Sequence, residues 1–314
     1  MCPPHYASAN YGHKNVPVAG EGLKDPFTVQ EVSRVLQGVA NKSAPGPDYL
    51  RHAAWKRLDS SRDIITAILN TCRLNRKIPS SWKDSTTVLI HKGGNIGQLD
   101  NWRPIALQNT IYNIYATAIA KRVTSWAIDS NTMSPSQKEF LPYEGCLVLK
   151  LAGLRGSTLE IIRDIYMDST THVRTKSGLT PSIVCRRGVK QGCPLSPILF
   201  NLVMEAVIRS VESVPDIGYK VAGVTVKSLT YADDLCVLAS SQSTTQKMLD
   251  MAHQASQWAG LTFNIRKCAT LTIWTETETL TLTLMLNPAS LGPAALPLTW
   301  NLRRFFRCLY ISMT

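Results

Sequence analysis

The stretch RGVKQGCPLSPILFN (residues 187–201), followed by YADDL (residues 231–235), decides the fold expected for this chain. Asp233 and Asp234 stand between apolar, β-prone runs, a pattern that predicts a hairpin with two carboxylates at its tip. Carboxylate oxygens in such a place can hold Mg²⁺. Aspartate also favours turns through its own backbone hydrogen bonds, so the pair alone more often marks a solvated turn.

Taken together, the two stretches resemble the reverse transcriptase family, in the branch found in non-LTR retrotransposons. The resemblance covers about residues 28–273. It implies an α+β fold, that of a right-hand polymerase in which fingers and palm place mixed helices around an antiparallel palm sheet. The thumb of such polymerases is not recognisable in this sequence.

The resemblance also implies an activity. An intact relative copies an RNA template into DNA from the 3′-hydroxyl of a DNA primer, using deoxynucleoside triphosphates and two Mg²⁺ (or Mn²⁺) ions. Asp233 and Asp234 would then be catalytic metal ligands. In GLTFNIRKC (residues 260–268), Lys267 would be a catalytic general acid. The family roles carried over from the two opening stretches are nucleotide binding by Gln191 and Gly192, and template or primer binding by Tyr231, Arg187 and Lys190.

Two basic segments resemble the fingers hairpin of the family. WKDSTTVLIHKGG (residues 82–94) is a β-branched strand that ends on a basic turn, and NWRPIAL (residues 101–107) reads as a second basic turn. The family grips the triphosphate of the incoming nucleotide there, which implies that role for Arg103 and Lys92. An arginine can bind a phosphate bidentately, whereas a lysine acts as a point charge. A lysine beside a Gly-Gly turn can equally be solvated.

One expected element is missing between the two halves of the match. In the family, a strand at this place carries the first catalytic aspartate, but LVLKLAGLRGSTL (residues 147–159) contains no acidic residue. Asp233 and Asp234 alone supply only part of a two-metal cage. The nearest other carboxylates in sequence are Glu144, Glu160 and Asp164. Losing that strand also predicts an exposed sheet edge and marginal stability.

Periodicity and capping patterns predict the remaining elements. Thr28 and Glu31 form a capping-box pattern, and Ser196 with Pro197 is a typical helix start. The alternating TETETLTLTLML (residues 275–286) predicts an isolated, aggregation-prone strand. Helices are expected at 28–39, 111–128, 196–206 and 244–258, with one or two helices over 53–74 and a hairpin around residues 176–178.

These patterns divide the chain into segments. The expected organisation is a loose lead-in at 1–25, a fingers-like region at 26–146, the junction at 147–159, a palm-like region at 160–273 and an unrelated low-complexity tail at 274–314. The sequence does not indicate an oligomeric state.

Charge and cysteine usage point to an intracellular partner of nucleic acid. The formal net charge is +12, from 34 Lys and Arg against 22 Asp and Glu, which favours polyanion binding through counterion release. The 8 cysteines are scattered without zinc-finger spacing and are expected to be reduced thiols. No apolar run is long enough to span a membrane and no signal-peptide pattern is present, so we expect the nucleus or cytoplasm.

Three hypotheses for function remain open at this point. The first is the reverse transcriptase domain of a non-LTR element, an RNA-directed DNA polymerase whose activity in this chain is impaired or lost with the missing aspartate. The second is a non-catalytic remnant that still binds nucleic acid. The third is a decayed or mis-spliced element product without function.

Overall fold

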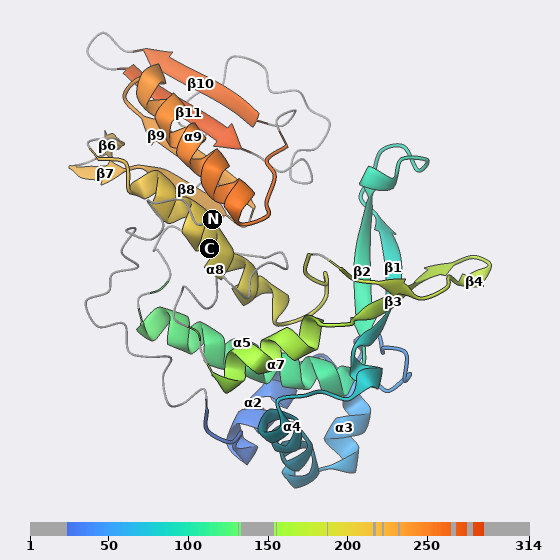
Figure 1. Cartoon of the computed structure of the whole chain (residues 1–314). Coiled ribbons are helices and arrows are strands. Elements are labelled where there is room, and N and C mark those ends of the chain that lie inside the picture. Colours follow the sequence, from blue (N-terminus) through green and yellow to red (C-terminus); the bar gives the residue numbers. More distant parts are fainter. Residues whose placement is uncertain are drawn as a thin grey trace.

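A computed structural model describes residues 24–130, 132, 154, 156–186, 188–215, 218–221, 223–231, 233–264, 268–274 and 279–285. Helices and strands are both abundant, so the expected α+β class is confirmed. One group of helices carries a projecting sheet, a second sheet lies apart from it, and α8 runs between the two parts (Figure 1). Among the described residues, no helix has the length and apolar character needed to cross a bilayer.

The helical part is built from amphipathic segments that bury one face each. In the first helix, the Thr28 hydroxyl accepts a hydrogen bond from the backbone N–H of Glu31, and the Glu31 carboxylate accepts one from the Thr28 N–H, so the predicted capping box is confirmed. Val32, Val35 and Leu36 are buried from this helix into the common core. The helices are α2 (Val29–Gly38), α3 (His52–Leu58), α4 (Asp63–Asn75), α5 (Thr110–Asp129) and α7 (Ser157–Tyr166).

A mixed sheet projects from this helical part (Figure 1). Its order is β2-β1-β3-β4, with β5 also paired to β3; β1 and β3 run parallel, and the other pairs are antiparallel. The segment expected as a second basic turn is instead a strand, because it pairs along its whole length with β1. The hairpin expected around residues 176–178 is confirmed. The strands are β1 (Asp84–His91), β2 (Trp102–Gln108), β3 (Thr170–Thr175), β4 (Gly178–Leu179) and β5 (Ile183–Val184), with short 3₁₀ turns η2 (Ser80–Trp82) and η3 (Leu99–Asn101).

The second sheet has four antiparallel strands in the order β10-β11-β9-β8. The Thr/Leu strand β11 was expected to be isolated, and that prediction is wrong: its backbone pairs with β9 on one side and β10 on the other. The elements here are α8 (Ser196–Glu212), β6 (Tyr219–Val221), β7 (Val224–Val226), β8 (Ser228–Tyr231), β9 (Asp234–Ala239), α9 (Gln242–Trp258), β10 (Cys268–Trp274) and β11 (Thr279–Met285).

Strand β9 is buried on both faces. Leu235, Val237 and Ala239 pack in one core with residues of α8 and α9. Cys236 and Leu238 point to the other face, where Tyr219, Val226 and Leu229 pack against them. The period of two along the strand therefore places an apolar side chain in a core at every position from 235 to 239. Packing on both faces therefore holds β9, whose first residue is Asp234, in one position.

Candidate functional site

The two aspartates lie where β8 turns into β9. Tyr231 pairs with Asp234 at the end of the ladder, so the connection is two residues long and Asp233 is its second residue. Asp233 is exposed and Asp234 is half-buried. Partial burial raises the pKa of the Asp233 carboxyl, while a hydrogen bond from its own backbone N–H acts in the opposite direction. The predicted hairpin with carboxylates at its tip is confirmed.

Adjacent carboxylates are suitable oxygen ligands for Mg²⁺ or Mn²⁺, but the described part of the chain does not complete a two-metal cage. The strands that flank β9 contain no acidic residue. No group of three or more His, Cys, Asp and Glu that could hold a metal occurs among the described residues. Asp233 and Asp234 thus fit one part of the expected metal site only.

The other carboxylates considered from the sequence have different partners. Glu160 forms an ion pair with Arg76 at 2.8 Å. Asp164 pairs with Lys83 at 2.8 Å and accepts a hydrogen bond from the backbone N–H of Ile78. Both lie on α7, which stands apart from the β8–β9 hairpin in Figure 1. Glu144 lies outside the described residues.

The loop before α8 docks on β2 of the projecting sheet. The Gln191 carbonyl accepts a 2.7 Å hydrogen bond from the Ala106 N–H. Gly192 has φ +111°, and a Cβ at this position would lie 2.6 Å from the Ala106 carbonyl oxygen. Gly192 was expected to bind nucleotide. In the structure, this glycine allows the loop to approach strand β2 closely. The Gln191 side chain is exposed beside this contact.

Two predicted residues of this stretch take other positions. Lys190, expected at template or primer, is buried, and its ammonium group donates to the Lys83 carbonyl at 3.0 Å. Ser196 is the first residue of α8 and does not cap it, because the cap position is Leu195. The Ser196 hydroxyl instead donates to the Lys190 carbonyl at 3.0 Å. Arg187 lies outside the described residues, and so does Lys267.

Arg103 and Lys92 lie near the end of the β1–β2 hairpin. Arg103 is exposed on β2 opposite Ile90. Lys92 follows β1, and its ammonium group donates to the Asp100 carbonyl at 3.0 Å. Next to them, the rings of His91 and Trp102 are in contact at 4.9 Å between centroids. The β1–β2 hairpin and the β8–β9 hairpin belong to different sheets, and the two hairpins stand apart in Figure 1.

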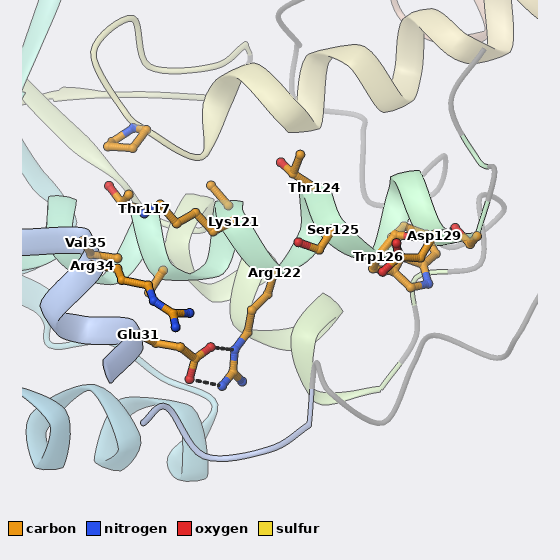
Figure 2. Close-up of a pocket in the computed structure, with 14 residues that line it drawn as sticks. Glu31, Arg34, Val35, Thr117, Lys121, Arg122, Thr124, Ser125, Trp126 and Asp129 are labelled. Carbon is orange, nitrogen blue, oxygen red and sulfur yellow. Dashed lines mark hydrogen bonds and ion pairs between the residues drawn. The ribbon is translucent and has the colours of Figure 1, made fainter. Parts of the chain in front are cut away.

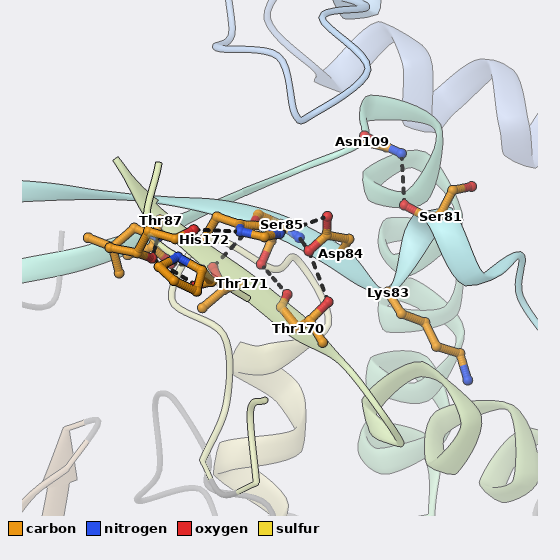
Figure 3. A network of polar contacts seen from close by, with 12 residues as sticks. Ser81, Lys83, Asp84, Ser85, Thr87, Asn109, Thr170, Thr171 and His172 are labelled. Atoms are coloured by element: carbon orange, nitrogen blue, oxygen red, sulfur yellow. Dashed lines mark hydrogen bonds and ion pairs between the residues drawn. The ribbon is translucent and has the colours of Figure 1, made fainter. Parts of the chain in front are cut away.

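A polar network that sequence reasoning missed holds β1 to β3 (Figure 3). The Thr170 hydroxyl donates to the Asp84 carboxylate at 2.9 Å, and the Ser85 hydroxyl donates to the Thr170 carbonyl at 3.0 Å. The hydroxyls of Thr87 and Thr171 share a 2.7 Å hydrogen bond. The run of hydroxyl residues at 85–87, directly after Asp84, was a signal for this network, but its partners lie more than 80 residues away.

A groove of about 860 Å³ lies between α2 and α5, beside Pro194 in the loop before α8 (Figure 2). Arg122 is bound to the Glu31 carboxylate at 2.8 Å there. Arg34 and Lys121 also line the groove and are exposed, and neither has a hydrogen-bond or ion-pair partner among the described residues. The groove thus presents two available cations, which sequence reasoning did not identify.

Comparison with known proteins shows the family. The profile described as "Reverse transcriptase (RNA-dependent DNA polymerase)" matches residues 90–285, which is more than half of the chain. The chain therefore belongs to the reverse transcriptase family, and its relatives place it in the non-LTR retrotransposon branch. The match includes β10 and β11.

The relatives are proteins of mobile elements. The "Retrovirus-related Pol polyprotein from type-1 retrotransposable element R2" of Popillia japonica is 27% identical over 290 residues, covering 79% of this chain and 40% of the relative. The type-2 element R2DM polyprotein of Drosophila melanogaster is 26% identical over 75% of this chain and 25% of its own length. The "RNA-directed DNA polymerase from mobile element jockey" of the same species is 23% identical over 82% of this chain and 34% of its own length. The chain thus spans less than half of each of these relatives.

Proposed function

We propose that this chain is the fingers and palm part of a non-LTR reverse transcriptase, built for RNA-templated DNA synthesis by nucleotidyl transfer but impaired in that reaction. The projecting sheet with Arg103 and Lys92 would be the fingers, and the sheet β10-β11-β9-β8 the palm. RNA template, DNA primer and deoxynucleoside triphosphates are the proposed partners. Mg²⁺ ions, when bound, would activate the primer hydroxyl and neutralise the leaving pyrophosphate.

The observation that carries the proposal is the β8–β9 hairpin, which presents Asp233 and Asp234 together at one turn. The impairment follows from what surrounds this turn. Neither flanking strand supplies a carboxylate, and the described residues contain no third ligand beside the pair. A site with two carboxylates holds the metal ions more weakly than a complete cage would.

Primer extension tests both parts of the proposal. The chain is incubated with a primed RNA template, deoxynucleoside triphosphates and Mg²⁺, beside the double variant Asp233→Ala, Asp234→Ala. We expect no product above that variant at ordinary Mg²⁺ concentration. Synthesis that depends on Mg²⁺ and is abolished in the variant would refute the impairment and establish the polymerase.

The encoding DNA gives a complementary test of the impairment. If the region around codons 146–155 contains an aspartate-bearing segment skipped as an intron, the parent protein is a complete enzyme. An uninterrupted reading frame there would mean that the deletion belongs to the protein itself.

The groove between α2 and α5 favours a second candidate function, nucleic-acid binding without catalysis. Arg34 and Lys121 are available to phosphates, and the chain carries a net charge of +12. Fluorescence anisotropy with labelled single-stranded RNA should show affinity that falls with salt. Arg34→Glu with Lys121→Glu should weaken it more than Arg57→Glu with Lys77→Glu, an equal charge change at exposed positions outside the groove. Aggregation without binding would instead support a decayed product.

A further inference from the structure

Lys190, in the loop before α8, is a buried cation. Its side chain is 7% exposed, and its ammonium group donates to the backbone carbonyl of Lys83 at 3.0 Å. Lys83 directs its own ammonium group elsewhere, to Asp164, so the two lysines do not compete for one carboxylate. Burial lowers the pKa of Lys190, while the nearby Asp84 carboxylate and cysteine thiols act to raise it. Burying a lysine without an ion-pair partner costs free energy, so its burial here indicates a structural role for the side chain.

The backbone of Lys190 is held as firmly as its side chain. Its carbonyl accepts hydrogen bonds from the Cys193 N–H and from the Ser196 hydroxyl, both at 3.0 Å. The Cys193 thiol in turn lies 3.1 Å from the buried Tyr112 hydroxyl on α5. The loop is therefore tied to the residue before β1 by the lysine ammonium, to α8 by the lysine carbonyl and to α5 by the cysteine.

The next two residues contact strand β2. The Gln191 carbonyl binds the Ala106 N–H at 2.7 Å, Gly192 lies against the Ala106 carbonyl, and the Gln191 side chain remains exposed. Ala106 is three residues from Arg103 on the same strand. The loop contact thus sets how Gln191 is placed relative to the strand that carries Arg103.

From this geometry we infer that Lys190 is a positioning residue: its buried contact with the Lys83 carbonyl fixes the loop that presents Gln191 beside β2. The inference rests on the proposed function and on the nucleotide-binding roles that the resemblance implies for Gln191 and Arg103. It assigns Lys190 no contact with template or primer. Lys190 acts through Gln191, so its removal should affect nucleotide affinity and leave RNA affinity unchanged.

The closing experiment compares Lys190→Met, which keeps the side-chain length but loses the donor, with the exposed control Lys77→Met. Hydrogen exchange reports the loop contact directly. In Lys190→Met the Ala106 amide should exchange about tenfold faster, while amides of α4 and α9 keep their wild-type rates. Affinity for a fluorescent deoxynucleoside triphosphate should fall about tenfold with RNA affinity unchanged. In a background of Gln191→Ala the lysine substitution should add little, because the two residues act in series.

Each other outcome has a defined meaning. Wild-type exchange at Ala106 in Lys190→Met would overturn the inference, and so would an equal loss of nucleotide and RNA affinity. If Lys190→Met does not fold, Lys190→Gln, which keeps an N–H donor on a shorter chain, takes its place, and faster Ala106 exchange in that variant is the expected result. If the wild-type chain binds no nucleotide, the proposed function fails, and the exchange comparison still decides whether Lys190 holds the loop.

Discussion

Strand β9 is buried through apolar contacts on both faces, whereas β1 buries its polar residues and exposes its apolar ones. Val237 on β9 is 0% exposed in the core formed with α8 and α9, while on β1 Ser85 is 0% exposed and Ile90 is 54% exposed. The stability of the Asp-Asp hairpin thus comes from hydrophobic burial, which is large but not directional. The position of the projecting sheet comes from hydrogen bonds, which contribute less net stability but require a defined geometry between donor and acceptor.

The difference has a counterpart in the roles proposed for the two sheets. A metal-holding turn has to be rigid, and β9 meets this through packing on both faces. A sheet that holds a nucleotide against a loop has to be placed at a defined distance from that loop, and the Ala106–Gln191 contact and the Asp84–Thr170 contact do this. Substitutions in the two sheets should therefore differ in the size of their effects.

The largest effect is expected from a charge inside the core beneath β9. Val237→Asp would place a carboxylate without a partner among apolar side chains, at a cost of at least about 4 kcal/mol in the free energy of unfolding. Val224→Asp is the matched control, because Val224 is an exposed strand residue of the same part. Urea unfolding followed by circular dichroism should show a large loss for the first variant and almost none for the second. Equal losses would contradict the apolar account of this sheet.

A smaller effect is expected where the loop meets β2. In Gly192→Ala, the added Cβ would clash with the Ala106 carbonyl at a φ of +111°, and we expect a loss of about 3 kcal/mol. Gly188→Ala separates the two causes, since Gly188 also has a positive φ, +82°, but no atom lies within 4 Å of the place that its Cβ would take. That variant should lose about 1 kcal/mol. Thermal unfolding measures both, and a Gly188 loss as large as the Gly192 loss would remove the close approach as the cause.

Local patterns in the sequence predicted the elements that depend on neighbouring residues. The Asp-Asp hairpin, the capping box of Thr28 with Glu31 and helix α9 all follow from residues within a few positions of each other. Each of these predictions is confirmed, because turn chemistry and helix capping are set by short-range sterics and hydrogen bonds.

The features that the sequence did not predict depend on distant partners. The alternating Thr/Leu run predicted a strand, but not that β11 lies between β9 and β10, since alternation does not specify a pairing partner. The burial of Lys190 depends on a carbonyl 107 residues away. The Ser196 hydroxyl looked like a cap because the residue type and the following proline fit, yet a buried acceptor at Lys190 takes its hydrogen. The sequence predicted Asp233 and the missing carboxylate, but the ion pairs that Glu160 and Asp164 form instead, with Arg76 and Lys83, required the structure.

The third prediction concerns the helical part that supports the projecting sheet. Arg122 binds the Glu31 carboxylate and the carbonyls of Asp25 and Pro26, and its guanidinium lies 4.3 Å from the centre of the Phe27 ring. Arg122→Met should cost about 2 kcal/mol in the free energy of unfolding. Lys121→Met is the control, as Lys121 is exposed and has no partner among the described residues.

The same pair predicts a dependence of stability on pH. Partial burial acts to raise the pKa of Glu31, but hydrogen bonds from Arg122 and from the Thr28 N–H outweigh it and lower the pKa below its ordinary value of 4.5. A carboxylate with a lowered folded-state pKa stabilises the protein fully above its unfolded-state pKa, and this contribution is lost as the pH falls through the folded-state value. The free energy of unfolding, measured by denaturation between about pH 6 and pH 3, should therefore decrease less with falling pH in Arg122→Met than in wild type. Parallel curves would exclude the pair as the cause.

The smallest effect is expected within the polar network of β1. Thr87→Val keeps the shape of the side chain but removes the hydroxyl that meets Thr171 at 2.7 Å, while the Thr171 hydroxyl keeps the Ser85 carbonyl as acceptor at 3.2 Å. Because one partner remains satisfied, the loss should be about 1 kcal/mol, and Thr225→Val at an exposed strand position should lose almost nothing. Hydrogen exchange should also show faster opening of the β1–β3 ladder in Thr87→Val, with β9 unchanged. Slower exchange or no change at β1 would mean that hydroxyl contacts do not hold this sheet.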